Sequence, residues 1–310
     1  SDFYSFHDYN FGNCFRFNGL DTDAQAYSDY SYTGSSSGEV RKLKKPGFRN
    51  GLSLELYTGP PDDVAFRVNT GIRFFVHNQS IVPITLEDGM IAPVGMQTNI
   101  GIQRKFISRL PKPYSNCIDK LDESTTMNEN LRQMYRLKRE GHLYEYQQNI
   151  CMKVCYKMYA DRACECTDIS LRHLRVNELN YSNCLSKEQL ECLKSADTDF
   201  FNSTKSDECI AMCPAECNVV KYDLKVSMSD YPTKWYAELM NEPTRAFALE
   251  EIYSTENITE ELIKKTTLML NINYDSFNYE QLTEVPAISF ETLLANVGGN
   301  FGLFTGASLL

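Results

Sequence analysis

Four segments of the chain alternate apolar and polar residues with the two-residue period of half-buried β-strands. They lie at residues 52–56, 72–76, 220–228 and 268–274. Clusters of Gly and Pro at residues 59–61 and 89–95 mark turns between strands in the first half. We therefore predict an all-β first half and a return to strands after residue 217.

The middle of the chain has a helical pattern instead. From about residue 128 apolar residues recur at helical spacing, and Tyr146, Ile150, Val154 and Met158 form a stripe with a four-residue period. The run Ser-Lys-Glu-Gln from Ser186 is a capping box that predicts a helix start. A further helix is expected at residues 235–240. The order strands, helices, strands predicts an α+β fold with a helical insertion.

Nine of the eleven cysteines lie between Cys151 and Cys217. Steps of four residues place Cys151 with Cys155 on one helix face, and likewise the three cysteines of the run 209–217. The simplest pairing of two such ladders is concentric, although ten cysteines permit roughly 900 pairings and spacing alone leaves the others open. That arrangement pairs Cys117 with Cys217, Cys151 with Cys213, Cys155 with Cys209, Cys164 with Cys192 and Cys166 with Cys184.

Zinc binding is the alternative explanation of a cysteine cluster. Zinc sites usually contain C-x₂-C pairs or Cys/His sets, and the sequence has no C-x₂-C and no histidine in ligand spacing among His7, His77, His142 and His173. We therefore favour disulfides, each contributing about 2–4 kcal/mol, and expect no metal and no cofactor.

Composition places the chain outside the cell. Disulfides require an oxidising compartment, and four N-x-[ST] sequons predict glycosylation at Asn78, Asn180, Asn202 and Asn257. The net charge of −10 excludes a broad basic face for nucleic acid. The sequence contains no nucleophile elbow, HExxH motif or phosphate loop, so we do not expect an enzyme.

The last residues have a membrane-like composition. Residues 297–310 carry no charge and become more apolar toward the end, so we expect a piece of a longer membrane protein. Gly298, Gly302 and Gly306 are spaced by four, which favours a packed or pore-lining helix over a flexible tail. Upstream acidic residues would concentrate cations above a pore, or else form a solvated face: Asp275, Glu280, Glu284 and Glu291.

Together with the cysteine lattice, several motifs carry a specific resemblance. They are FGNCFRFN at 11–18, GLSLELY at 51–57, APVGMQT at 92–98, LPKPYSNC at 110–117, CPAECNVVKYDL at 213–224 and GGNFGLFTGASLL at 298–310. Over nearly all 310 residues the chain resembles the extracellular domain of the degenerin/epithelial sodium channel family. The resemblance implies a plasma-membrane, multi-pass subunit of a trimeric, amiloride-blocked, sodium-selective channel.

The family's ectodomain resembles a hand, and this implies a division of the chain into parts. The concentric cysteine pairing is also the family's arrangement in its thumb. The implied parts are the end of the finger at 1–13, palm and β-ball at 14–113, thumb at 114–217, a palm strand at 218–231, the knuckle region with its helix at 232–262, palm strand and wrist at 263–292, and the start of the second transmembrane helix at 293–310.

Single residues also receive roles by resemblance. Tyr114 matches an aromatic that docks the thumb onto the first membrane helix, and Ala295 matches the small-residue gating position of degenerins. The constriction that selects ions matches Gly306, Ala307 and Ser308. The family's partner of Cys14 lies N-terminal to this chain, so Cys14 is expected to be unpaired within it.

The stimulus is predicted from departures within the family. Acid-sensing members carry two thumb carboxylates shortly after the equivalent of Cys192. In this chain Lys194 and Ser195 occupy the nearer position and only Asp199 remains. The partner carboxylates are also displaced, with Asp62 and Asp63 as the nearest candidates. The cysteine run 209–217 is closer to invertebrate FMRFamide-gated channels. We therefore predict opening by an amidated neuropeptide, for which an acidic, aromatic-rich ectodomain is suited. The expected partners are two further subunits, sodium ions, the peptide, amiloride and the lipid bilayer.

Three alternatives to peptide gating keep the channel: opening by acid, by mechanical force, or constitutively. A more distant one is a secreted cysteine-rich binding module, which would leave the apolar C-terminal stretch unexplained.

Overall fold

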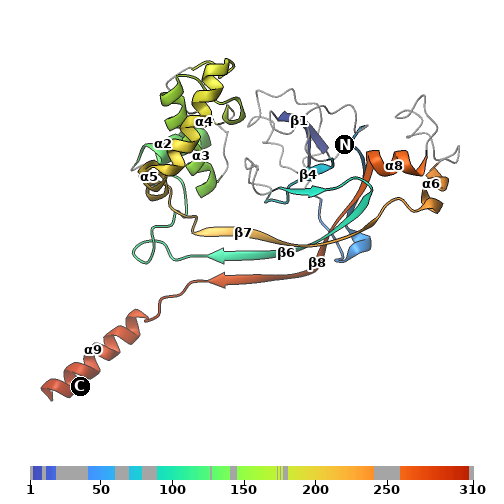
Figure 1. Cartoon of the computed structure of the whole chain (residues 1–310). Coiled ribbons are helices and arrows are strands. Elements are labelled where there is room, and N and C mark those ends of the chain that lie inside the picture. The colour runs from blue at the N-terminus through green and yellow to red at the C-terminus, as the bar shows by residue number, and fades with distance from the viewer. Residues whose placement is uncertain are drawn as a thin grey trace.

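A four-stranded mixed sheet forms the body of the computed structural model (Figure 1). The structure describes residues 3–8, 12–18, 41–59, 70–78, 89–125, 128–139, 145–172, 174, 176, 181–240 and 259–306. The sheet order is β3-β8-β6-β7, formed by Leu52–Tyr57, Thr267–Thr283, Met96–Ser108 and Asn218–Asp230. β6 runs parallel to β8 and antiparallel to β7. The α+β class is confirmed.

The alternating segments form the strands of this sheet. Leu54 and Leu56 on β3 pack against a buried cluster that includes Ile100, Leu268 and Leu270. The last strand is longer than the alternation at residues 268–274 predicted. β8 continues to Thr283 through exposed residues that pair with β6. A bulge interrupts this pairing between Ile102 and Arg104.

Two small sheets accompany the body among the described residues. β1 (Phe3–Asp8) and β2 (Gly12–Phe17) form a hairpin that sequence reasoning missed, and Cys14 lies in it opposite Phe6, with a half-buried side chain. β4 (Ile72–Phe74) pairs with β5 (Met90–Ala92), so the strand predicted through Val76 ends two residues earlier. Short 3₁₀ turns lie at Phe48–Asn50, Glu123–Thr125 and Ile169–Leu171.

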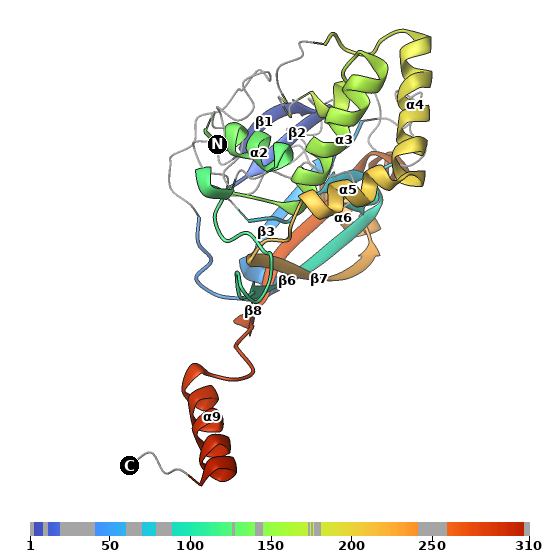
Figure 2. The same ribbon diagram turned by 90° about the vertical axis from the view of Figure 1, so that its left-hand side faces the viewer.

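At one end of the sheet, the described part of residues 117–217 contains four helices that form a separate domain, here called the helical domain (Figures 1 and 2). They are α2 (Glu129–Arg139), α3 (Gln148–Cys164), α4 (Lys187–Asn202) and α5 (Thr204–Met212). Ile150 and Val154 are buried in its core, as the stripe predicted. Tyr146, however, precedes α3; its ring is buried in the same core cluster, and its hydroxyl donates to the carbonyl of Pro214 at 2.7 Å.

The capping box at Ser186 is confirmed, with Ser186 and Gln189 exchanging hydrogen bonds at the start of α4. At the far end of the sheet lie α6 (Lys234–Met240) and α8 (Glu260–Thr266), the first of them at the predicted position (Figure 1). α9 (Phe290–Thr305) projects away from the body at the same end as the helical domain (Figures 1 and 2).

Candidate gating and ion-conduction elements

Five disulfides hold the helical domain together, and they are the five pairs of the concentric arrangement. Cys151–Cys213 and Cys155–Cys209 join α3 to the α5 region, with Cα–Cα distances of 5.7 and 5.9 Å. Cys117–Cys217 closes the base of the domain where β7 begins. The bridges cross-link α3 to the α5 region and close the base of the domain, so they limit how far its helices can separate.

The base of the helical domain meets the sheet through the loop after β6. Arg109 donates its backbone N–H to the carbonyl of Cys217 at 2.7 Å and its guanidinium to the carbonyl of Glu216, also at 2.7 Å. Tyr114, on the same loop, is 62% exposed. An exposed aromatic at this base is available for contact with a segment outside the described residues, which is what its predicted docking role requires.

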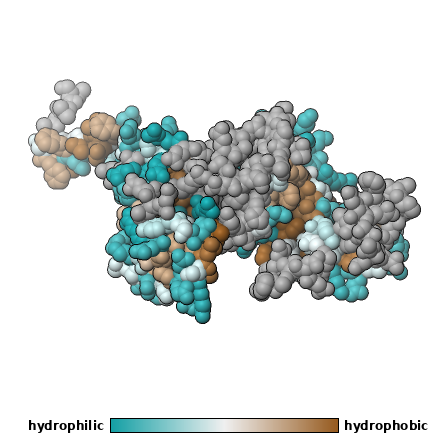
Figure 3. Space-filling view, turned by 90° about the horizontal axis from the view of Figure 1, so that it is seen from above, coloured by the Kyte–Doolittle hydropathy of each residue, from teal (hydrophilic) through white to brown (hydrophobic). Residues whose placement is uncertain are grey.

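α9 holds the predicted gating position. Ser289 caps the helix by accepting from the N–H of Thr292, and Ala295 is exposed on it. Large apolar side chains are also exposed on α9, and Figure 3 shows hydrophobic residues gathered on this projecting end. They are Phe290, Leu293, Leu294, Val297, Phe301, Leu303 and Phe304. Exposed apolar patches of this kind mark surfaces that contact lipid or other protein.

The glycine stripe is shorter than predicted. Gly298 and Gly302 lie on α9, but the helix ends at Thr305 and Gly306 adopts a left-handed conformation with φ +66°. Glycine tolerates this conformation because it lacks a Cβ, so Gly306 terminates the helix instead of continuing its small-residue face. Ala307 and Ser308 lie outside the described residues. Within the described ranges, each helix is too short or too polar to cross a bilayer.

The acidic residues above α9 are engaged rather than free. Asp275 pairs with Lys225 at 2.7 Å, and Glu280 pairs with Lys105 at 3.1 Å. Glu284 accepts from the backbone N–H of Leu110 at 3.0 Å. These contacts favour a role in holding strands together over a role as unpaired charges that attract cations.

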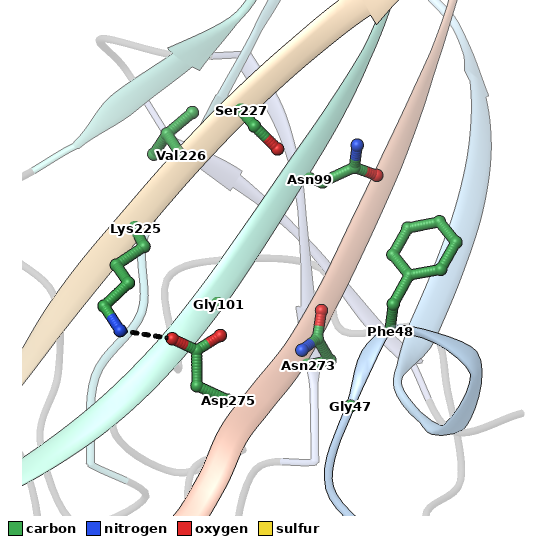
Figure 4. Close-up of a pocket in the computed structure, with 9 residues that line it drawn as sticks. All are labelled: Gly47, Phe48, Asn99, Gly101, Lys225, Val226, Ser227, Asn273 and Asp275. Atoms are coloured by element: carbon green, nitrogen blue, oxygen red, sulfur yellow. Dashed lines mark ion pairs between the residues drawn. The ribbon is translucent and has the colours of Figure 1, made fainter.

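A hollow of about 310 Å³ lies on the sheet beside the Lys225–Asp275 pair (Figure 4). It is lined by residues of β6, β7 and β8 and by Phe48. The Asp275 side chain crosses β6 at Gly101 to reach Lys225, and a Cβ on Gly101 would stand 2.0 Å from its Oδ1 atom. The Asp275 carboxylate raises the pKa of Lys225 by hydrogen bonding and by its charge.

Replacing Gly101 by alanine should therefore displace Asp275. We expect the Tm to fall by about 2–4 °C, whereas the same change in an Asp275→Ala background should leave the Tm within about 1 °C, because the clashing carboxylate is gone. Thermal unfolding of the four proteins checks this. Equal losses in both backgrounds would show that the Gly101 backbone itself, and not Asp275, excludes a side chain.

Several structural contacts had no counterpart in the sequence analysis. Tyr231 and Tyr236 both donate to the Glu55 carboxylate and so join the α6 region to β3. The pKa of Tyr231 is raised, mainly by burial and secondly by its hydrogen bond to Glu55. Lys157 and Asp161 form a buried ion pair at 2.7 Å in α3. Their four-residue spacing is a recognisable helix pattern, but the Glu55 contact joins residues 176 positions apart and leaves no local signal.

The remaining predicted residues are dispersed. Lys194, Ser195 and Asp199 are exposed on α4, while Asp62 and Asp63 lie outside the described residues. Asn202 is exposed at the last residue of α4 and Asn78 is half-buried. Asn180 and Asn257 fall outside the described ranges.

The fold and these elements define a class of protein: a disulfide-rich α+β ectodomain that leads into an exposed apolar helix. A model of the amiloride-sensitive sodium channel family matches residues 1–310, and the chain belongs to that family, whose members are ion channels and not enzymes.

Relatives in this family align over most of the chain. It is 28% identical over 305 residues to the epithelial sodium channel subunit beta of Mus musculus, which covers 97% of this chain and 42% of that protein. It is 27% identical over 311 residues to the alpha subunit of Xenopus laevis, covering 100% of this chain and 43% of that protein. The chain thus spans about two fifths of the length of these relatives.

Proposed function

We propose that this protein is a subunit of a trimeric, sodium-selective, amiloride-sensitive channel of the plasma membrane. The observation that carries the proposal is the family match over the whole chain. The five nested disulfides and the exposed apolar α9 support it, because a ligand-binding module secreted into water has no use for such a helix.

Within this proposal the helical domain acts as the thumb, the four-stranded sheet as the palm, and α6 as the knuckle. Residues 1–13 belong to the finger, residues 14–113 to the palm and β-ball, and residues 293–310 to the second membrane helix. Gly306, Ala307 and Ser308 form the ion-selecting constriction. Ala295 occupies the gating position, and Tyr114 docks the thumb onto the first membrane helix.

The stimulus is a separate part of the proposal. The acidic charge and the abundance of aromatic residues support an amidated peptide as agonist. The relatives bear the name epithelial sodium channel, which supports the sodium channel but not the peptide. Constitutive opening is therefore the alternative to peptide gating that agrees with the names of these relatives.

Expression of the full-length protein in oocytes, alone and with further family subunits, tests both parts. We expect a sodium current that amiloride blocks, and we expect an FMRFamide-type peptide to increase it several-fold. A current already maximal at rest would replace peptide gating by constitutive opening, and a current evoked by acidic buffer alone would replace it by proton gating. If the protein reached the cell surface and gave no amiloride-sensitive current, the proposal that it is a channel subunit would be contradicted.

A further inference from the structure

Three strand ends meet where the helical domain and α9 both join the sheet. β6 ends at Ser108, β7 begins at Asn218 and β8 ends at Thr283, and Figure 1 shows these ends at the same side of the sheet. The helical domain is attached to β6 and β7, whereas α9 follows β8. Within this chain, a displacement of one relative to the other passes through this junction.

On the side of the helical domain, Glu216 makes the connection. Its carboxylate accepts from the backbone N–H of Gln148 at 2.7 Å, at the start of α3. The N-cap residue of this helix, Gln147, makes no side-chain hydrogen bond to the helix. The Glu216 carboxylate therefore serves as the cap for a free N–H group of the first turn. Its negative charge also interacts favourably with the helix N-terminus. The Glu216 carbonyl in turn accepts from the Arg109 guanidinium.

On the side of α9, Glu284 makes the connection. Its backbone N–H donates to the carbonyl of Ser108 at 2.9 Å, and its carboxylate accepts from the N–H of Leu110 at 3.0 Å. Beyond it, Val285 is 74% and Ile288 55% exposed on the way to the Ser289 cap of α9. Glu284 is thus held at two points just before the chain leaves the sheet.

We propose that Glu284 is a positioning residue for gating, which couples α9 to the helical domain through the Arg109–Leu110 peptide unit; this inference rests on the proposed channel function. Arg109 binds the Glu216–Cys217 backbone, and Leu110, the next residue, binds Glu284. The Leu110 N–H belongs to the peptide unit that starts at the Cα of Arg109, so a displacement of the Arg109 backbone with the helical domain shifts the N–H that holds Glu284. A charged acceptor strengthens that bond relative to a neutral one.

A double-mutant cycle on the full-length channel tests the coupling. Glu216→Ala removes the contact to α3, and Glu284→Ala removes the contact to Leu110. We expect the change in the closed–open equilibrium constant caused by Glu216→Ala to differ at least about threefold between the wild type and the Glu284→Ala background, as contacts in one network do. Single-channel recording gives that constant, and the unitary conductance should stay unchanged.

Glu280 provides the matched control. It pairs with Lys105 across the same two strands, inside the ladder, where Lys105 and Glu280 are already held by backbone pairing. Glu280→Ala and Glu216→Ala should therefore act independently, within about 1.5-fold of additivity. If Glu284→Ala and Glu216→Ala were also additive in a channel that conducts, the gating role of Glu284 would be overturned. The proposed channel function would remain intact.

A measurement without current separates the two proposals. Amide hydrogen exchange of the purified full-length protein should show the Leu110 N–H exchanging at least about threefold faster in Glu284→Ala, since its acceptor is lost. Glu284→Gln keeps an acceptor oxygen and should exchange within about twofold of the wild type. Unchanged exchange in Glu284→Ala would overturn the contact; absence of any wild-type current would overturn the channel function and this gating role with it.

Discussion

Replacing both Cys117 and Cys217 by serine should lower the free energy of unfolding by about 4 kcal/mol. This bridge spans 100 residues and encloses the Cys151–Cys213 bridge, which spans 62. When the outer bridge is broken, the inner bridges still hold the helices together. The chain that gains freedom in the unfolded state is therefore only the loop between the two bridges, about 38 residues. Breaking the outer bridge also releases the base of the helical domain from the start of β7. Guanidinium unfolding without reductant measures the loss.

The matched control is the double serine variant of Cys155 and Cys209. That bridge spans 54 residues and lies directly inside Cys151–Cys213, so breaking it frees a loop of only about 8 residues and should cost about 2.5 kcal/mol. If the inner variant lost as much stability as the outer one, nesting would not decide the contribution of each bridge.

Gly51→Ala is expected to have the second largest effect, a loss of about 3 kcal/mol. A Cβ at Gly51 would stand 2.1 Å from the carbonyl oxygen of Ile272 and 2.7 Å from the Cβ of Asn273. The obstacle is backbone of β8, which is held on both sides by β3 and β6 and cannot withdraw as a side chain could. The start of β3 would have to separate from the sheet, and thermal and guanidinium unfolding would record this.

Gly59→Ala is the control that measures the conformational cost of losing a glycine without a steric clash. Gly59 lies just beyond the other end of β3 with φ +83°, and a Cβ placed there would meet open space, so Gly59→Ala should cost only about 1 kcal/mol of backbone strain. A Gly51→Ala variant as stable as Gly59→Ala would mean that β3 shifts without losing its pairing to β8.

The exposed apolar helix and the nested disulfides are the parts of the candidate site that sequence reasoning found. It missed the contacts that join them. The sequence offered Glu284 as a charge near a pore or as part of a solvated face, whereas the structure engages its carboxylate with Leu110, 174 residues away in the chain. Gly306 was placed on a helical stripe by its spacing, but spacing does not register where a helix stops, and the left-handed conformation at Gly306 ends it.

Features that depend on neighbouring residues can be read from the local sequence. The two-residue alternation of β3 and β7 and the capping box of α4 are local because their hydrogen bonds or buried faces repeat within a few positions. The four-residue cysteine steps belong here too, since they follow from helix geometry.

Features that depend on distant partners follow from the three-dimensional fold alone. β6 lies between strands that begin more than a hundred residues later. The second half of β8 has no buried face and is a strand because β6 supplies its hydrogen bonds. The ion pair of Lys225 with Asp275 and the bond of Glu284 to Leu110 likewise exist because the sheet brings these residues together. Such contacts repay the entropy of closing long loops only once the whole sheet has formed, so no local pattern announces them.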